Sequence, residues 1–235
     1  MTGSGLEGVR AVSFDLDDTF WDCAPAIARA ERVLEDWLRR EAPAVLEHHD
    51  ERSVAAARLK LLEAEPALAG DVTELRKRSL AALFREAEAE HALSEEAFEV
   101  FRRARSEVTL YEGVDALLAD LAPRYRIAAI TNGNADLGIV GIADRFELAM
   151  HASLDWPAKP EPAMFEHVIE RFGIEPRALL HVGDSAATDV GGAHRAGARA
   201  VWFNAGGADW DAAAGPAPAF EVGSIAGLRA LLLGG

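Results

Sequence analysis

A short apolar run that ends in a cluster of carboxylates constrains this chain more than any other stretch. Residues 9–14 (VRAVSF) are mostly apolar and include β-branched and aromatic side chains, which is typical of a buried strand. Asp15, Asp17 and Asp18 follow directly. Charged carboxylates inside a protein need a partner or a metal ion, and open α/β sheets bind ligands at the carboxyl ends of their strands. The stretch therefore predicts a site at the end of a buried strand.

The next part of the chain has a helical pattern and no strand signal, from Ala24 to about Val108. Four helices are predicted. The first ends near Pro43, the second covers 53–65, the third runs from the Asp71 capping box to about 90, and the fourth begins near 94. One side of the fourth helix carries Ala97, Phe98, Phe101, Ala104, Arg105 and Val108. This pattern indicates a helical module inserted after the first strand.

From residue 111 onward the predicted strands alternate with helices. The strands are expected at 126–131, 146–150, 178–182 and 198–203, and the helices at 113–121, 135–142, 160–172, 186–196 and 224–233. Residues 206–218, rich in Gly, Ala and Pro, are expected to form a surface loop. Such alternation favours an α/β fold with a parallel sheet covered on both faces.

Three later strand ends also carry polar residues. Residues 131–133 (TNG) offer a hydroxyl and exposed backbone N–H groups that suit an oxyanion such as phosphate. Lys159 precedes a predicted helix N-terminus, and both features favour anions. Asp184 and Asp189 suit a hard divalent cation, most simply Mg²⁺. Each feature alone could be a helix cap, a solvated lysine or a turn, but the four strand ends together favour phosphoryl transfer.

The overall charge and apolar content exclude several classes of protein. The 24 Lys and Arg against 39 Asp and Glu give a net charge of −15, which argues against nucleic acid or an anionic membrane as partner. No run approaches the roughly 20 apolar residues that span a bilayer, and the first residues lack the pattern of a signal peptide. The single cysteine, Cys23, excludes an internal disulfide and fits a reducing compartment. We expect a soluble cytoplasmic protein, monomeric or homodimeric.

In these motifs the sequence resembles the haloacid dehalogenase-like hydrolase superfamily. FDLDDT is similar to the first family motif, residues 131–133 to the second, Lys159-Pro160 to the third and GDSAATD to the fourth. The likeness runs from about Val9 to Leu233. It implies a Rossmann-like parallel-sheet core, residues 1–19 and 111–235, with an inserted α-helical cap, residues 20–110.

The resemblance also implies roles for the acidic residues. Asp15 would attack phosphorus and form an aspartyl-phosphate, and Asp17 would protonate the leaving oxygen and then deprotonate the hydrolytic water. Mg²⁺ would be held by the Asp15 and Asp184 carboxylates and the Asp17 backbone carbonyl. A divalent ion at this place would offset the repulsion between a carboxylate and a phosphate. Asp18 is expected to be a structural or capping residue.

The remaining motif residues would surround the phosphoryl group. Thr131, the Asn132 N–H group and Lys159 would hold the phosphoryl oxygens. Asp189 and Ser185 would lie behind these groups, with Asp189 bound to the metal waters or to Lys159. The implied partner is a small-molecule phosphate ester.

The implied activity is Mg²⁺-dependent hydrolysis of a small phosphorylated metabolite. The resemblance extends, through SFDLDDTFWD, EPALAGDVTELRKRSL, AITNGNAD and LLHVGDSAATDVGGA, to a bacterial group acting on flavin mononucleotide (FMN) and 5-amino-6-(5-phosphoribitylamino)uracil. A broad-specificity sugar-phosphate or nucleotide phosphatase is an alternative. A 2-haloacid dehalogenase is another, although the dehalogenases of this family lack an acid at the position of Asp17. A catalytically silent binding module is the fourth, and the intact motifs argue against it.

Several residues outside the motifs are candidate substrate contacts. Arg76 and Arg78 on the third predicted helix could reach the substrate, or could be solvent-facing charges. Phe20 and Trp21 could line the entrance, or could pack in a core. Trp156 stands where relatives carry a small residue, three positions before Lys159, and is hypothesised to contact the organic part of the substrate.

Overall fold

The computed structural model describes residues 5–234, so the predicted core boundaries at residues 1 and 235 lie outside the described residues. Six parallel strands form one sheet in the order β3-β2-β1-β4-β5-β6. Their bounds are β1 Ala11–Phe14, β2 Arg126–Thr131, β3 Leu148–His151, β4 Leu179–Gly183, β5 Arg199–Phe203 and β6 Phe220–Val222. The predicted α/β fold is confirmed, and the first strand, β1, lies inside the sheet between β2 and β4.

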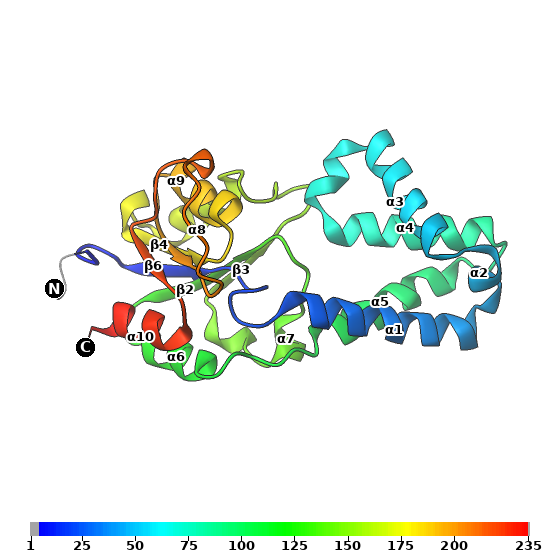
Figure 1. Ribbon diagram of the computed structural model, residues 1–235, viewed down its shortest axis with the longest axis horizontal. Helices are drawn as coiled ribbons and strands as arrows, with labels where there is room; N and C mark the ends of the chain where they lie inside the picture. The colour runs from blue at the N-terminus through cyan, green and yellow to red at the C-terminus, as the bar shows by residue number, and fades with distance from the viewer. Residues whose placement is uncertain (1–4, 235) are drawn as a thin grey trace.

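Helices cover both faces of the sheet (Figure 1). On one face α6 (Val114–Leu121) and α10 (Ile225–Leu233) pack on a core that includes Val12 and Phe14 of β1. On the other face α8 (Ala163–Phe172) and α9 (Gly191–Arg195) pack on a second core that includes Ala11. Because both faces are covered, β1 has no exposed side chain and its end can deliver polar groups to a shielded site.

Residues 23–106, which follow β1, form five α-helices that project to one side of the sheet (Figure 1). They are α1 (Cys23–Glu41), α2 (Pro43–His48), α3 (Glu51–Ala64), α4 (Val72–Glu86) and α5 (Ala92–Ser106), with a 3₁₀ turn at Pro66–Gly70. We call residues 23–106 the helical unit. It has its own apolar core. Four helices were predicted here. Pro43 does follow the end of α1, but it also begins α2, since proline fits the first turn of a helix.

Other elements differ from the prediction at their ends. Helix α7 (Leu137–Val140) is shorter than expected, because the Asp136 carboxylate caps its first N–H groups and Gly141, with φ of 86°, ends it. The predicted helix 186–196 begins as a π-helical turn, Ala186–Val190, and continues as α9. Strand β6 was not predicted. None of the helices among residues 5–234 has the length and apolar character to cross a membrane.

The chain enters and leaves the helical unit at neighbouring points. The backbone N–H of Tyr111 donates a 2.8 Å hydrogen bond to the carbonyl of Phe20. The Tyr111 hydroxyl donates another, of 2.5 Å, to the Asp22 carboxylate. The start of α1 and the end of α5 are therefore both held close to the carboxyl end of β1.

Candidate active site

The four strand ends that carry the predicted motifs meet at one edge of the sheet. Asp15 follows β1, Thr131 ends β2, and Asp184 follows β4, while Lys159 comes from the loop after β3. They line a cavity of about 170 Å³ together with Asp17, Asp18, Asn132, Gly133, Thr188 and Asp189. The structure thus brings together every predicted motif residue except Ser185 around one small space.

Lys159 is the centre of this cluster. Its Nζ donates hydrogen bonds to Oδ1 of Asp15 at 2.6 Å, to Oδ1 of Asp189 at 2.6 Å and to the Ile130 carbonyl at 2.7 Å. The side chain is only 2% exposed. Burial alone would lower the pKa of Lys159, but the two carboxylates outweigh it and hold that pKa above its ordinary value. Lys159 is therefore a fixed positive charge beside Asp15.

Asp189 serves to orient other groups in this structure. Its Oδ1 also accepts from Nε2 of His181 at 3.1 Å, and its Oδ2 accepts from the Ser185 backbone N–H at 2.9 Å. Burial would raise its pKa, but Lys159 and His181 hold the pKa of Asp189 well below the usual range. Because a carboxylate only accepts, Nε2 of His181 carries the proton and Nδ1 accepts from Ser13 Oγ at 2.9 Å. This geometry agrees with the predicted place of Asp189 and Ser185 behind the reacting groups.

Three carboxylates in the cluster lie close enough to bind one metal ion. Oxygen atoms of Asp15, Asp184 and Asp189 all lie within 4.8 Å of one another. When all three are ionised, they leave two negative charges against the one ammonium of Lys159, 3 − 1 = 2. Burial, followed by repulsion from its neighbours, raises the pKa of Asp15 to about 8 despite Lys159, and burial and Asp189 raise that of Asp184 to about 6. A hard divalent cation with oxygen ligands fits this charge excess.

Asp15 and Asp184 are the better candidate ligands of the three. Both oxygens of Asp189 already accept hydrogen bonds. The Asp184 backbone is fixed by Trp202, whose Nε1 donates to the Asp184 carbonyl at 2.7 Å. The residues present therefore fit the predicted Mg²⁺ site, with Asp15 and Asp184 supplying the carboxylates.

Asp17 is held at both carboxylate oxygens. Nε1 of Trp21 donates to Oδ1 at 2.8 Å, and Nη2 of Arg105 donates to Oδ2 at 2.5 Å. Its neighbour Asp18 accepts a 2.8 Å hydrogen bond from the backbone N–H of Cys23, the first residue of α1. This contact agrees with the expectation that Asp18 is a structural or capping residue, although Asp22 holds the N-cap position of α1.

The predicted phosphate-binding residues after β2 are held in a defined turn. The Thr131 hydroxyl accepts from the Gly133 N–H at 2.9 Å. The Asn132 side chain pairs with the backbone of Lys159: Oδ1 accepts from its N–H at 2.8 Å and Nδ2 donates to its carbonyl at 2.9 Å. Asn132 thus links the second and third motifs through its side chain, and its backbone N–H is the group predicted to hold phosphate.

The aromatic candidates for substrate contact lie in packed positions. Phe20 is fully buried and packs against Phe14, with ring centroids 5.1 Å apart, so it does not line an entrance in this structure. Trp21 is also fully buried, and its side chain reaches the site through its hydrogen bond to Asp17. Trp156 is half-buried and lies 4.5 Å from the His167 ring on α8. None of these positions shows an open aromatic surface over the cavity.

The two candidate arginines of α4 differ from each other. Arg76 is largely buried, donates to Glu31 at 2.8 Å and stacks on the Phe101 ring, 3.4 Å from its centroid. Arg78 is more exposed and pairs with Glu74 and Glu65. Neither lines the 170 Å³ cavity.

Arg105 is the residue of this site that the sequence analysis did not single out. It is a fully buried arginine on α5, and it contacts Asp17 across 88 positions of sequence. In the sequence, Arg105 is marked only by its position on the apolar side of a predicted helix, where a charged side chain needs a partner.

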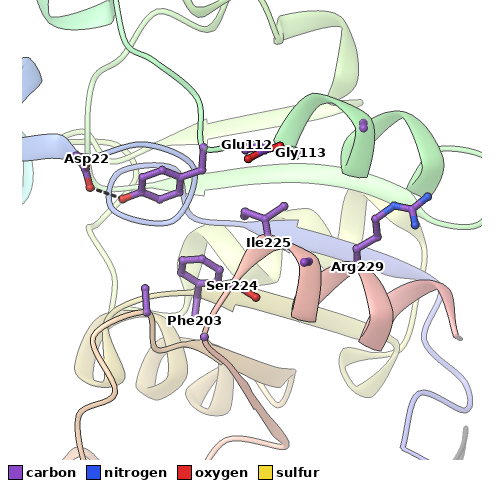
Figure 2. Close-up of a pocket in the computed structure, with 12 residues that line it drawn as sticks. Asp22, Glu112, Gly113, Phe203, Ser224, Ile225 and Arg229 are labelled. Carbon is purple, nitrogen blue, oxygen red and sulfur yellow. Dashed lines mark hydrogen bonds between the residues drawn. The ribbon is translucent and has the colours of Figure 1, made fainter.

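A second cavity, of about 740 Å³, lies away from these motifs (Figure 2). Figure 2 shows Ile225 and Arg229 of α10, with Ser224 just before that helix, on one side of it and Glu112 and Gly113 ahead of α6 on another. None of the predicted catalytic, phosphate-binding or metal-binding residues lines it. The chemistry of the chain is therefore assigned to the smaller cavity.

Comparisons with known proteins agree with this geometry. The model of the haloacid dehalogenase-like hydrolase family matches residues 9–197. The chain is 33% identical to the 5-amino-6-(5-phospho-D-ribitylamino)uracil phosphatase YigB of Escherichia coli, over 97% of this chain and 98% of that protein. It is 27% identical to N-acylneuraminate-9-phosphatase of Rattus norvegicus, over 97% and 95%. A crystal structure described as 2-haloacid dehalogenase from Pseudomonas syringae pv. Tomato is 36% identical, with a TM-score of 0.90 over 96% of this chain and 98% of that one.

Proposed function

This chain belongs to the haloacid dehalogenase-like hydrolases, and on that premise we propose that it is a Mg²⁺-dependent phosphatase that acts through an aspartyl-phosphate on Asp15. The substrate is a small phosphorylated metabolite. One observation carries the proposal: Asp15 lies in a small cavity between a fixed ammonium, Lys159, and a second carboxylate, Asp184. Such a site can bring a nucleophilic carboxylate and a phosphate together despite their like charges.

In the first step a carboxylate oxygen of Asp15 attacks phosphorus, and the bond from phosphorus to the ester oxygen breaks. The leaving oxygen takes a proton from Asp17, which must carry it at the start of this step; the ion pair with Arg105 belongs to the ionised form that acts in the second step. Lys159 offsets the negative charge that gathers between Asp15 and the phosphoryl group, while Thr131 and the Asn132 N–H hold the phosphoryl oxygens. Bound Mg²⁺, held by the Asp15 and Asp184 carboxylates and the Asp17 carbonyl, would supply further positive charge there.

In the second step Asp17, now ionised, takes a proton from a water molecule. The water oxygen attacks the phosphorus of the aspartyl-phosphate, the bond to Asp15 breaks, and inorganic phosphate leaves. Asp189 acts indirectly, since it fixes the position of Lys159 through a 2.6 Å hydrogen bond. The charge and the proton inventory of the site are restored at the end of the cycle.

We propose that residues 20–110 act as a cap over this site. The cavity of about 170 Å³ is smaller than the roughly 300 Å³ or more of typical ligand sites. It has room for a phosphoryl group and a small organic part. The organic part of a substrate as large as FMN would extend beyond this cavity, toward the helical unit.

FMN and 5-amino-6-(5-phosphoribitylamino)uracil are the proposed substrates, supported by the 33% identity with YigB over nearly the whole chain. A broad-specificity sugar-phosphate or nucleotide phosphatase is the neighbouring alternative. A panel of both substrates, sugar phosphates and nucleotides, with phosphate release as readout, separates the two. The cytoplasmic location and the monomeric or homodimeric state stay predictions.

The activity is tested with p-nitrophenyl phosphate in the presence of Mg²⁺ and of EDTA. We expect turnover that EDTA removes, and a loss of at least about a thousandfold in Asp15→Asn, because that variant lacks the nucleophile. Circular dichroism of Asp15→Asn should match the wild type. Robust turnover by Asp15→Asn would refute the covalent mechanism. Absence of metal-dependent turnover on the whole panel would support the silent binding module instead.

A second candidate activity, 2-haloacid dehalogenation, is favoured by the similarity to the Pseudomonas syringae structure. Halide is a stable leaving group that needs no proton, so an acid at position 17 has no task in that reaction. Halide release from 2-chloropropionate tests it directly. The presence and fixed orientation of Asp17 support ester hydrolysis.

A further inference from the structure

We propose that Arg105 is a positioning residue for Asp17, and that the helical unit thereby controls proton transfer to the leaving group. The inference rests on the proposed function, because it requires Asp17 to be the group that protonates the leaving oxygen. It adds a residue from α5, outside the four motifs, to the machinery of the reaction.

The Asp17 carboxylate is held from the two ends of the helical unit. Trp21, which donates to Oδ1, precedes the first residue of α1 by two positions. Arg105, which donates to Oδ2, lies in the last turn of α5. The side chain that must meet the substrate's leaving oxygen is thus oriented by both connections between the core and the helical unit.

Arg105 is itself fixed from the core. Its Nε donates to the Asn134 side-chain oxygen at 3.0 Å, directly after the turn of the second motif. Gly133 leaves room for the pair: a Cβ atom there would lie 2.2 Å from Oδ2 of Asp17 and 2.8 Å from Nη2 of Arg105. A side chain at position 133 would displace the ion pair between Asp17 and Arg105, so the absence of a Cβ atom at Gly133 allows this contact to form.

Attachment of the helical unit to the core does not explain this arginine. Other bonds serve that purpose: Arg102 pairs with Asp136, the Asp136 N–H donates to Ser106 Oγ, and Asp71 accepts from the Leu154 N–H. A buried ion pair contributes little net stability compared with apolar residues of similar size. Nη1 of Arg105 is also buried without a hydrogen-bond partner among the described residues. What distinguishes Arg105 from these other links is its contact with Asp17.

The test uses the dependence of the rate on the leaving group. Phenolate is a poor leaving group that gains from a proton, whereas p-nitrophenolate leaves readily without one. Single-turnover release of the two phenols, with enzyme and Mg²⁺ in excess, isolates the first step. We expect Arg105→Gln to slow phenyl phosphate about tenfold or more and p-nitrophenyl phosphate less than about threefold, since acid catalysis contributes about 10²–10⁴-fold.

Arg102→Gln is the matched control. It lies one turn earlier on the same helix and loses a bond between the helical unit and the core, but it does not touch Asp17. It should change both esters by the same factor. In the Asp17→Asn background, Arg105→Gln should cause no further loss on phenyl phosphate, because residues that act as a unit are non-additive.

Equal slowing of both esters by Arg105→Gln, or an additive loss in the double variant, would overturn the inference. Should Arg105→Gln fail to fold, Arg105→Lys keeps the charge but loses the two-sided grip on Asp17 and Asn134, and the same comparison is made with it. A wild type that hydrolyses neither these two esters nor any phosphate ester of the substrate panel refutes the proposed function. An active wild type with unchanged selectivity in the Arg105 variants refutes only the positioning role.

Discussion

Binding of Mg²⁺ to the metal-free protein is expected to release about one proton at pH 7. The reason is the charge excess of the site, where burial and repulsion between carboxylates raise the pKa of Asp15 to about 8 and that of Asp184 to about 6. At pH 7 these values leave Asp15 about 0.9 and Asp184 about 0.1 protonated. Both groups must ionise to bind the cation, so about 0.9 + 0.1 = 1.0 proton leaves per ion.

The pH dependence of this release follows from the same two values. The release should rise to about 1.5 protons at pH 6 and fall to about 0.5 at pH 8. Since protons compete with the ion, the apparent affinity for Mg²⁺ should be roughly 20-fold weaker at pH 6 than at pH 7. When Mg²⁺ is limiting, phosphatase activity should therefore also fall as the pH falls.

Isothermal titration calorimetry in buffers of different ionisation enthalpy measures the number of protons directly. Asp15→Asn lacks the group that carries most of the proton at pH 7, so any Mg²⁺ that it still binds should release far less than one proton. A wild-type release below about 0.2 proton, unchanged between pH 6 and pH 8, would show that Lys159 keeps Asp15 ionised and would refute the reasoning.

Four further variants test other parts of the structure. In the metal-free protein Asp15→Asn should raise the thermal midpoint at pH 8. The pKa of Asp15 is raised in the folded state, so the stability of the wild type falls as the pH rises toward 8. The gain in midpoint should be smaller at pH 5, and an equal gain at both pH values would contradict this reasoning. Asp71→Ala removes a buried carboxylate that caps α4 and accepts from the Leu154 N–H, and should cost about 1–3 kcal/mol in urea unfolding; a smaller loss would mean that water replaces both bonds. Arg76→Gln loses the buried ion pair with Glu31 and the stacking on Phe101, so it should lower the urea midpoint more than Arg78→Gln, its more exposed control, and leave KM unchanged. A KM raised in Arg76→Gln alone would instead place Arg76 near the substrate. Trp156→Ala tests whether this ring contacts the organic part of the substrate, and an unchanged profile over sugar and nucleotide phosphates would assign it to packing on His167.

The parallel sheet and the motif positions could be predicted because their signals are local. A short apolar run followed by polar or charged residues marks a buried strand and its end, and this signal predicts β1, β2 and β4. Strand β6 escaped because its three residues, Phe220–Val222, follow a loop rich in Gly, Ala and Pro and carry no alternation that can be recognised. Pro43 follows the end of α1 and also begins α2. The sequence pattern predicts only the end of a helix at this position.

The contacts around Asp17 could not be predicted, because they depend on pairs that are distant in sequence. Trp21 was expected at an entrance or in a core, and in the structure it is a buried donor to Asp17. Arg105 was visible only as a charged residue on an apolar helix face. Its partner is chosen by the docking of α5 against the end of β1, and no pattern in one helix contains that information.

The hydrogen bond between Tyr111 and Phe20 has a consequence for how this protein can diversify. The chain leaves the sheet and returns to it at adjacent points. The helical unit is therefore attached to the core in the same way as a long surface loop, and changes in such loops cost little free energy of folding. Genetic change in the helical unit can therefore alter which molecules are admitted while the register of the sheet stays the same. Arg105 limits that freedom: a transplanted helical unit that lacks it would bring new selectivity without the grip on the acid.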